Sequence, residues 1–149
     1  MQSLADATPQ IALGALDGRY RPAIAPLIDH LSEPALNRMR VHVEVEWLIH
    51  LTDQSVLPGT SPLSDEQREA LRAIVTSFDA DSVKELAEIE AVTVHDVKAV
   101  EYYIGRRLAD IGIENLKAMV HFGCTSEDIN NLSYAVGVKG AVENVWLPA

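Results

Sequence analysis

The fold class of this chain depends on residues 32–47, which have the sequence SEPALNRMRVHVEVEW. Within it, residues 41–47 alternate between apolar and polar side chains, as a half-buried strand does. Ser32, however, is a favourable helix N-cap, and Glu33 and Pro34 suit the first helical turn. Apolar residues then recur at helical spacing, at Leu36, Met39, Val43 and Trp47. Because the cap and the longer spacing agree, and no turn signal bounds a strand, we predict a helix.

Capping boxes predict further helix starts along the chain. In such a box a Ser or Thr and a polar residue three positions later satisfy amide groups that the helix leaves free. The pairs are Ser64 with Gln67, Ser82 with Glu85, and Thr93 with Asp96, each followed by apolar residues at helical spacing. Residues 1–31 contain three prolines and a turn-like Asp-Gly pair, so we expect them to be irregular. The predicted fold class is therefore all-α.

The last predicted helix differs from the others in its apolar pattern. It begins at Thr125, where acidic residues in the first turn favour a helix N-terminus. Its apolar residues are spread around most of its circumference, at Leu132, Tyr134, Val136, Val138, Val142, Val145 and Trp146. A helix that is apolar all round is normally buried on all sides. We therefore expect partner helices to cover it, either from later in a longer protein or from other subunits.

Composition and charge narrow the classes of partner. The 149 residues are 48% hydrophobic and 23% charged, which is ordinary for a soluble globular protein. A net charge of −10 argues against a nucleic-acid partner but leaves a small anionic ligand possible. We find no apolar run near the roughly 20 residues that span a bilayer, and no signal peptide. Cys124 is the single cysteine, so no internal disulfide forms and a cytoplasmic location is expected.

Three short stretches combine polar side chains with backbone features that suit anion binding. The first is a tight turn that carries an arginine guanidinium and a tyrosine hydroxyl. The second and third are helix starts, where free backbone amides can donate to a ligand. Each also has a plainer interpretation, which is a surface turn with a solvated arginine or an ordinary helix cap. The candidate binding residues in the three stretches are Arg19, Tyr20, His95, Asp96, Thr125 and Ser126.

Two other patterns point to ordinary structural roles. His42, Glu46 and His50 share one helix face, but their spacing is that of any polar helix face and is not the His-Glu-x-x-His zinc pattern. Cys124 lies beside a helix start, but no histidine base is evident next to it, so a small buried residue is expected. We predict neither a metal site nor a cofactor.

Taken together and in this order, these stretches resemble the adenylosuccinate lyases of the fumarase/aspartase superfamily. Residues 17–20 read DGRY, residues 94–102 read VHDVKAVEY, and residues 124–131 read CTSEDINN. Residues 40–48, RVHVEVEWL, are similar to the first helix of that family. The similarity runs from about Leu13 to Ala149. Relatives often carry a polar residue where this chain has Val94, so no role is transferred to that position.

The resemblance implies an N-terminal helical domain over 1–124, followed by the start of a long central-bundle helix over 125–149. It implies elimination of fumarate from adenylosuccinate to give AMP, and from the related succinyl-carboxamide ribonucleotide of purine synthesis. Arg19 and Tyr20 would hold the nucleotide, and His95 and Asp96 would bind and orient substrate. Thr125 and Ser126 would bind a carboxylate or phosphate. The family is homotetrameric, and its active sites are shared among three subunits.

The residues that move protons in this family would lie elsewhere. The general acid histidine belongs to a Thr-His-Gly-Gln-type motif and the general base serine to a Ser-Ser-x-Met-Pro-x-Lys-type loop, and neither motif occurs in this sequence. Both are expected beyond Ala149, so the chain alone should lack turnover. Two alternatives are a helical binding module without catalysis and another lyase of the superfamily, although residues 17–20 and 95–102 argue against the latter.

Overall fold

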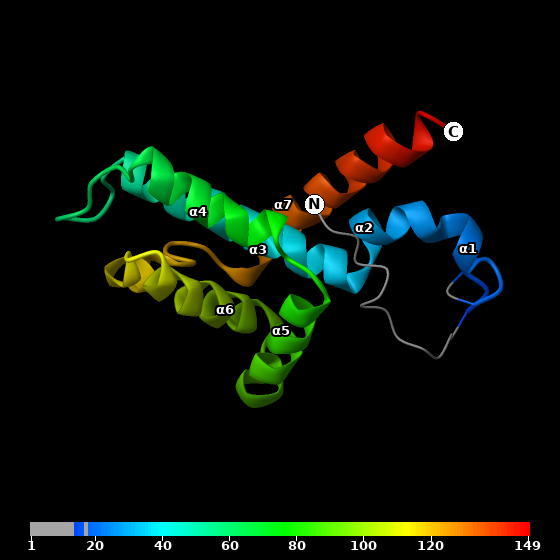
Figure 1. The fold of residues 1–149 in the computed structure, drawn as a ribbon, viewed down its shortest axis with the longest axis horizontal. Helices are drawn as coiled ribbons and strands as arrows, with labels where there is room; N and C mark the ends of the chain where they lie inside the picture. Colours follow the sequence, from blue (N-terminus) through cyan, green and yellow to red (C-terminus); the bar gives the residue numbers. More distant parts are fainter. Residues whose placement is uncertain (1–13, 17) are drawn as a thin grey trace.

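The computed structural model describes residues 14–16 and 18–149, so Asp17 of the first stretch lies outside the described residues. The helix α3, Glu33–Asp53, runs through the middle of the molecule (Figure 1). The hydroxyl of Ser32 accepts a hydrogen bond from the Ala35 amide at 3.2 Å, so the predicted N-cap is confirmed. The alternating stretch 41–47 is helical, and the described residues contain helices and no strands, which confirms the all-α prediction.

The segment before α3 is more regular than its prolines suggested. It forms α1 at Arg21–Ile24, a 3-10 turn at Ala25–Leu27 and α2 at Ile28–Leu31. The prediction of irregular chain was wrong for residues 21–31, because two of the prolines occupy first-turn positions, where a missing amide hydrogen costs nothing.

The remaining helices begin at residues that the capping patterns only partly identified. They are α4 (Asp65–Thr76), α5 (Ala80–Thr93), α6 (Asp96–Asp110), a 3-10 segment (Glu114–Met119), α7 (Ser126–Ala141) and a π-helical turn (Val142–Trp146).

The Ser64–Gln67 capping box is present as predicted. The box predicted at Ser82 was wrong, because Asp79 caps α5 and accepts from the Ser82 amide at 3.0 Å. The start predicted at Thr93 was also wrong, since α6 is capped by His95.

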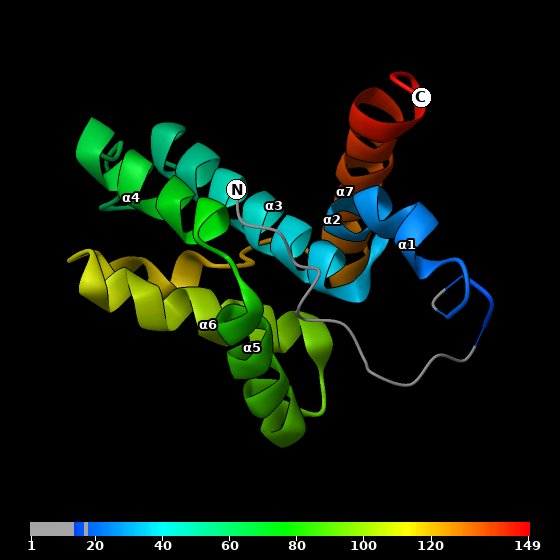
Figure 2. The same ribbon diagram turned by 45° about the vertical axis from the view of Figure 1, so that its right-hand side comes forward.

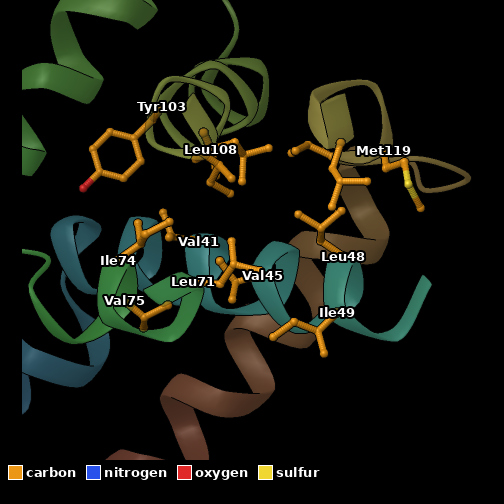
Figure 3. Close-up of a cluster of buried hydrophobic side chains, with 14 of the residues drawn as sticks. Val41, Val45, Leu48, Ile49, Leu71, Ile74, Val75, Tyr103, Leu108 and Met119 are labelled. Atoms are coloured by element: carbon orange, nitrogen blue, oxygen red, sulfur yellow. The ribbon is translucent and has the colours of Figure 1, made fainter. Parts of the chain in front are cut away.

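The hydrophobic core lies where α3 meets α4 and α6 (Figure 3). Its largest buried members include Leu48, Leu71, Phe78, Tyr103 and Leu108. The helix α3 is buried around most of its circumference, and three of its charged residues are buried with it: Arg38, Arg40 and Glu44. Burying a charge is costly unless it is paired, so these side chains are expected to have specific partners.

The helix α7 packs on α3 and α2 with one side only (Figure 2). Ile129, Ser133, Gly137 and Ala141 are buried. On its other sides, large apolar side chains remain exposed: Leu132, Tyr134, Val136 and Val138. As expected, the other described residues of the chain leave much of the apolar surface of this helix exposed.

None of the described helices is long and apolar enough to cross a membrane.

Candidate functional site

A single buried guanidinium joins two of the three predicted stretches. Arg40 on α3 is 5% exposed, and one of its amino groups lies 2.7 Å from Oδ2 of Asp96 at the start of α6. Its Nε donates to Oδ1 of Asn130 in α7 at 2.9 Å, and its other amino group donates to Asn37 at 3.0 Å. Arg40 therefore links the first turn of α6 to the second turn of α7.

The carboxylate of Asp96 is held in its ionised form. Partial burial raises its pKa, but the Val97 amide and the Arg40 guanidinium more than offset this, and the pKa lies below the ordinary value. Oδ1 accepts from the Val97 amide at 2.8 Å, and Oδ2 accepts from Arg40. The side chain is still 47% exposed, so the same oxygens can accept from a ligand hydroxyl.

His95 caps α6 and has a defined tautomer. Its Nδ1 accepts a hydrogen bond from the Lys98 amide at 3.2 Å. A nitrogen that accepts cannot carry the proton, so the neutral ring carries its hydrogen on Nε2. Because the side chain is 51% exposed, Nε2–H can serve as a donor to a bound ligand.

Val94, the residue before His95, adopts a strained backbone conformation. Its φ is +51°, in the left-handed region that a β-branched side chain rarely occupies. It ends α5, and its amide donates to Glu90 at 2.8 Å. With 88% of its surface exposed, Val94 gains little from packing, so the turn rather than the side chain determines its conformation.

A hollow of about 410 Å³ opens beside His95 and Asp96. It is lined by Glu33, Leu36, Asn37, Arg40, Glu90, Val94, His95 and Asp96. Three of these residues are acids, and the one guanidinium among them is already paired. The charge of the hollow therefore favours hydroxyl or amino donors of a ligand over its phosphate.

The start of α7 presents hydroxyl and amide donors as well as two acidic side chains, Glu127 and Asp128. The Asp128 carboxylate accepts from the Thr125 amide at 2.9 Å, which supplies half of the capping box. The first amides of a helix have no partner within the helix, and the helix dipole is positive there. Thr125 is exposed and Ser126 half-buried, so both hydroxyls and these amides can approach an anionic group.

Arg19 and Tyr20 lie apart from this arrangement. They lie in the turn before α1, at one edge of the molecule beyond α1 and α2 (Figures 1 and 2). The guanidinium of Arg19 lies 5.5 Å from the Tyr20 ring centroid, and the Tyr20 amide donates to Ala15 at 2.8 Å. The structure therefore brings His95 and Asp96 beside Arg40, which also binds Asn130 four residues after Ser126, and it places Arg19 and Tyr20 in a separate turn.

A larger hollow of about 580 Å³ opens beside the contact between α3 and α7 and is mainly apolar. His42, Glu46 and Cys124 contribute to its wall. The Glu46 carboxylate is bound on both oxygens by Arg72, at 2.7 and 2.8 Å, and this pairing lowers its pKa. Burial raises the pKa of the Cys124 thiol, which favours the unreactive thiol form.

Sequence reasoning missed four residues that organise the site: Arg40, Glu44, His121 and Asn130. Arg40 and Glu44 are one helical turn apart on α3, and the residues directly before and after each of them are buried. The available signal was that Arg40 and Glu44 each lie between two apolar or buried neighbours, because charged residues at such positions need partners from distant elements. His121 and Asn130 are those partners for Glu44 and Arg40.

Comparison with known sequences gives the family. The sequence profile of the family described as "Lyase" matches residues 18–149. The chain belongs to this lyase family. Curated relatives are adenylosuccinate lyases: those of Haemophilus influenzae and Escherichia coli K12 are 40% and 39% identical over 138 residues, and that of Legionella pneumophila is 38% identical over 140. The resemblance to adenylosuccinate lyases is thereby confirmed. Each alignment covers 92% of this chain and 30% of the relative, so the chain spans about a third of its relatives' length.

Proposed function

We propose that this chain contributes part of the substrate site of a lyase that eliminates fumarate from adenylosuccinate and from the related succinyl-carboxamide ribonucleotide. The observation that carries the proposal is the position of Arg40, which binds Asp96 at the start of α6 and Asn130 in the second turn of α7. One start offers a carboxylate and an imidazole donor, and the other offers hydroxyls and amides. A nucleotide that carries both hydroxyls and anionic groups matches this combination.

The roles follow from the chemistry of each group. Asp96 would accept from a ribose hydroxyl or a ligand amine, and His95 would donate from Nε2. Thr125 and Ser126 would bind a phosphate or carboxylate at the start of α7. Arg19 and Tyr20 would bind the nucleotide only after the N-terminal turn approaches a site shared with another chain, because in this structure they lie apart from the other groups.

The proton-transfer pair and the oligomer are part of the same proposal. A general acid histidine and a general base serine would be supplied by sequence motifs that this chain does not contain. The exposed apolar side chains of α7 would be covered in a homotetramer with shared active sites, with a domain boundary between Cys124 and Thr125. A cytoplasmic location is also part of the proposal. The purified chain should then bind nucleotide without turnover and should self-associate.

Nucleotide binding tests the proposal directly. Titration of the labelled chain with adenylosuccinate should shift the backbone amide signals of Lys98 and Ser126 in two-dimensional NMR spectra. His95→Ala should weaken binding, whereas His50→Ala, an exposed histidine of α3, serves as the matched control and should not. The absence of amide shifts at millimolar adenylosuccinate would contradict the proposal, and fumarate release by the chain alone would contradict the assignment of proton transfer elsewhere.

A further inference from the structure

Among residues 14–16 and 18–149, the most deeply buried acid is not explained by the binding roles above. The Glu44 side chain on α3 has no exposed surface, and Oε1 lies 2.5 Å from Nδ1 of His121. Its other oxygen, Oε2, accepts from the backbone amide of the same residue at 3.0 Å. Both oxygens of one buried carboxylate therefore bind one histidine, through its ring and its main chain.

His121 opens the turn that leads into α7. Its φ is +65°, so a side chain other than glycine holds the left-handed conformation, and the Cys124 amide donates back to its carbonyl at 3.2 Å. The indole of Trp47, also on α3, donates to the carbonyl of Phe122 at 2.9 Å. Glu44 and Trp47 are three residues apart on one helix face and hold two consecutive residues of the turn.

We infer that Glu44 is a positioning residue, which fixes the His121 ring and the turn 121–124 and thereby sets where Thr125 and Ser126 present their amides and hydroxyls. This inference rests on the proposed function for the role of those two residues. The turn joins the buried Val120 to the start of α7, and Glu44 is its charged anchor. A rigid attachment there limits movement of the proposed anion-binding groups.

The pairing also selects the tautomer of His121. A carboxylate accepts, so Nδ1 carries the hydrogen and Nε2 of the neutral ring is left as an acceptor. His95 has the opposite arrangement, with Nδ1 accepting and Nε2 carrying the hydrogen. The two histidines near the candidate site are thus expected to differ in tautomer, which gives an internal reference for the test.

Burying a carboxylate carries a large desolvation cost, so stability alone does not explain an acid at this position. A positioning role predicts a change that a packing role does not. In Glu44→Gln the side chain keeps its shape, but its amide group donates to Nδ1. The hydrogen of the neutral His121 ring should then move to Nε2.

The test uses NMR of the chain with labelled histidine, first without ligand. Glu44→Gln should switch His121 from the Nδ1–H to the Nε2–H tautomer, leave His95 unchanged, and shift the amide signals of Thr125 and Ser126. Glu46→Gln, two residues along the same helix and paired at the surface with Arg72, is the matched control and should change none of these signals. An unchanged His121 tautomer, or unchanged Thr125 and Ser126 signals, would overturn the inference.

Affinity for AMP provides the second measurement. We expect Glu44→Gln to weaken AMP binding on the order of tenfold, which corresponds to about 1.4 kcal/mol of lost binding free energy. If wild-type chain binds no AMP, the proposed function fails, while the ligand-free spectra still decide the role of Glu44. If Glu44→Gln does not fold, His121→Asn replaces it, because asparagine tolerates the left-handed backbone and keeps the amide bond to Glu44. That variant should shift the Thr125 and Ser126 signals, and the inference is wrong if they stay in place.

Discussion

Replacement of Arg40 by methionine should loosen the connection between α6 and α7. Arg40→Met keeps a long, flexible side chain in a buried position and removes three hydrogen bonds, to Asp96, Asn130 and Asn37. The contacts with Asp96 and Asn130 span 56 and 90 residues of sequence, so they are tertiary contacts that no neighbouring residue replaces.

The expected loss of stability can be worked out from the geometry. A hydrogen bond to a charged group contributes about 1.5–3 kcal/mol, and a neutral one about 1 kcal/mol. Asp96 is 47% exposed, so water replaces Arg40 as its partner in the variant, and the Arg40–Asp96 bond contributes less to stability than a fully buried one. Removal of the guanidinium also removes the cost of burying it. The net loss in the free energy of unfolding should be about 2 kcal/mol, which lowers the urea midpoint by roughly 1 M.

A double-mutant cycle with Asp96→Asn isolates the ion pair. Urea unfolding of the wild-type chain, Arg40→Met, Asp96→Asn and the double variant should give a coupling energy of about 1 kcal/mol. The wild-type chain should also show the amide signals of α6 and α7 shifting together on ligand binding. A coupling energy within about 0.3 kcal/mol of zero, which is the usual scatter for independent sites, would refute the conclusion that Arg40 links α6 to α7.

The other predictions concern packing, backbone strain and pH. Phe78→Ala should lower the free energy of unfolding by about 3–5 kcal/mol, because this ring is fully buried, whereas Val92→Ala, 84% exposed, should change it by less than about 0.5 kcal/mol in the same urea assay. Val94→Asn should stabilise the chain by about 1 kcal/mol, since asparagine tolerates positive φ better than valine, and a lower urea midpoint would contradict the assigned strain. Hydrogen bonding to Arg107 lowers the pKa of Glu85, so the folded state binds this proton more weakly than the unfolded state. Its stabilising effect should be present at neutral pH and be lost as pH falls below about 5; Glu85→Gln should flatten that part of the urea-midpoint profile, and an unchanged slope would refute it.

Helix caps illustrate where local sequence was sufficient. Ser32 and the Ser64–Gln67 box act within three or four residues, so their contacts form as soon as the helix does. Asp79 was missed because Ser82 nearby fitted the same pattern, and only the observed hydrogen bond distinguishes them. His95 was identified as a candidate binding residue, but its role as the cap of α6 was assigned to other residues.

The sequence by itself determined the helices, because caps and apolar spacing are local properties, and it determined the family, because three short stretches occur in one order. Tertiary structure decided which charged residues are buried and with what partner. Glu44 and His121 are 77 residues apart in the sequence, and Arg40 is 56 residues from Asp96 and 90 from Asn130. The helical pattern, which repeats over a few residues, therefore carried no information about these pairs. Tertiary structure also decided that α3, and not α7, is enclosed, since enclosure depends on which helices pack around a segment rather than on its apolar content.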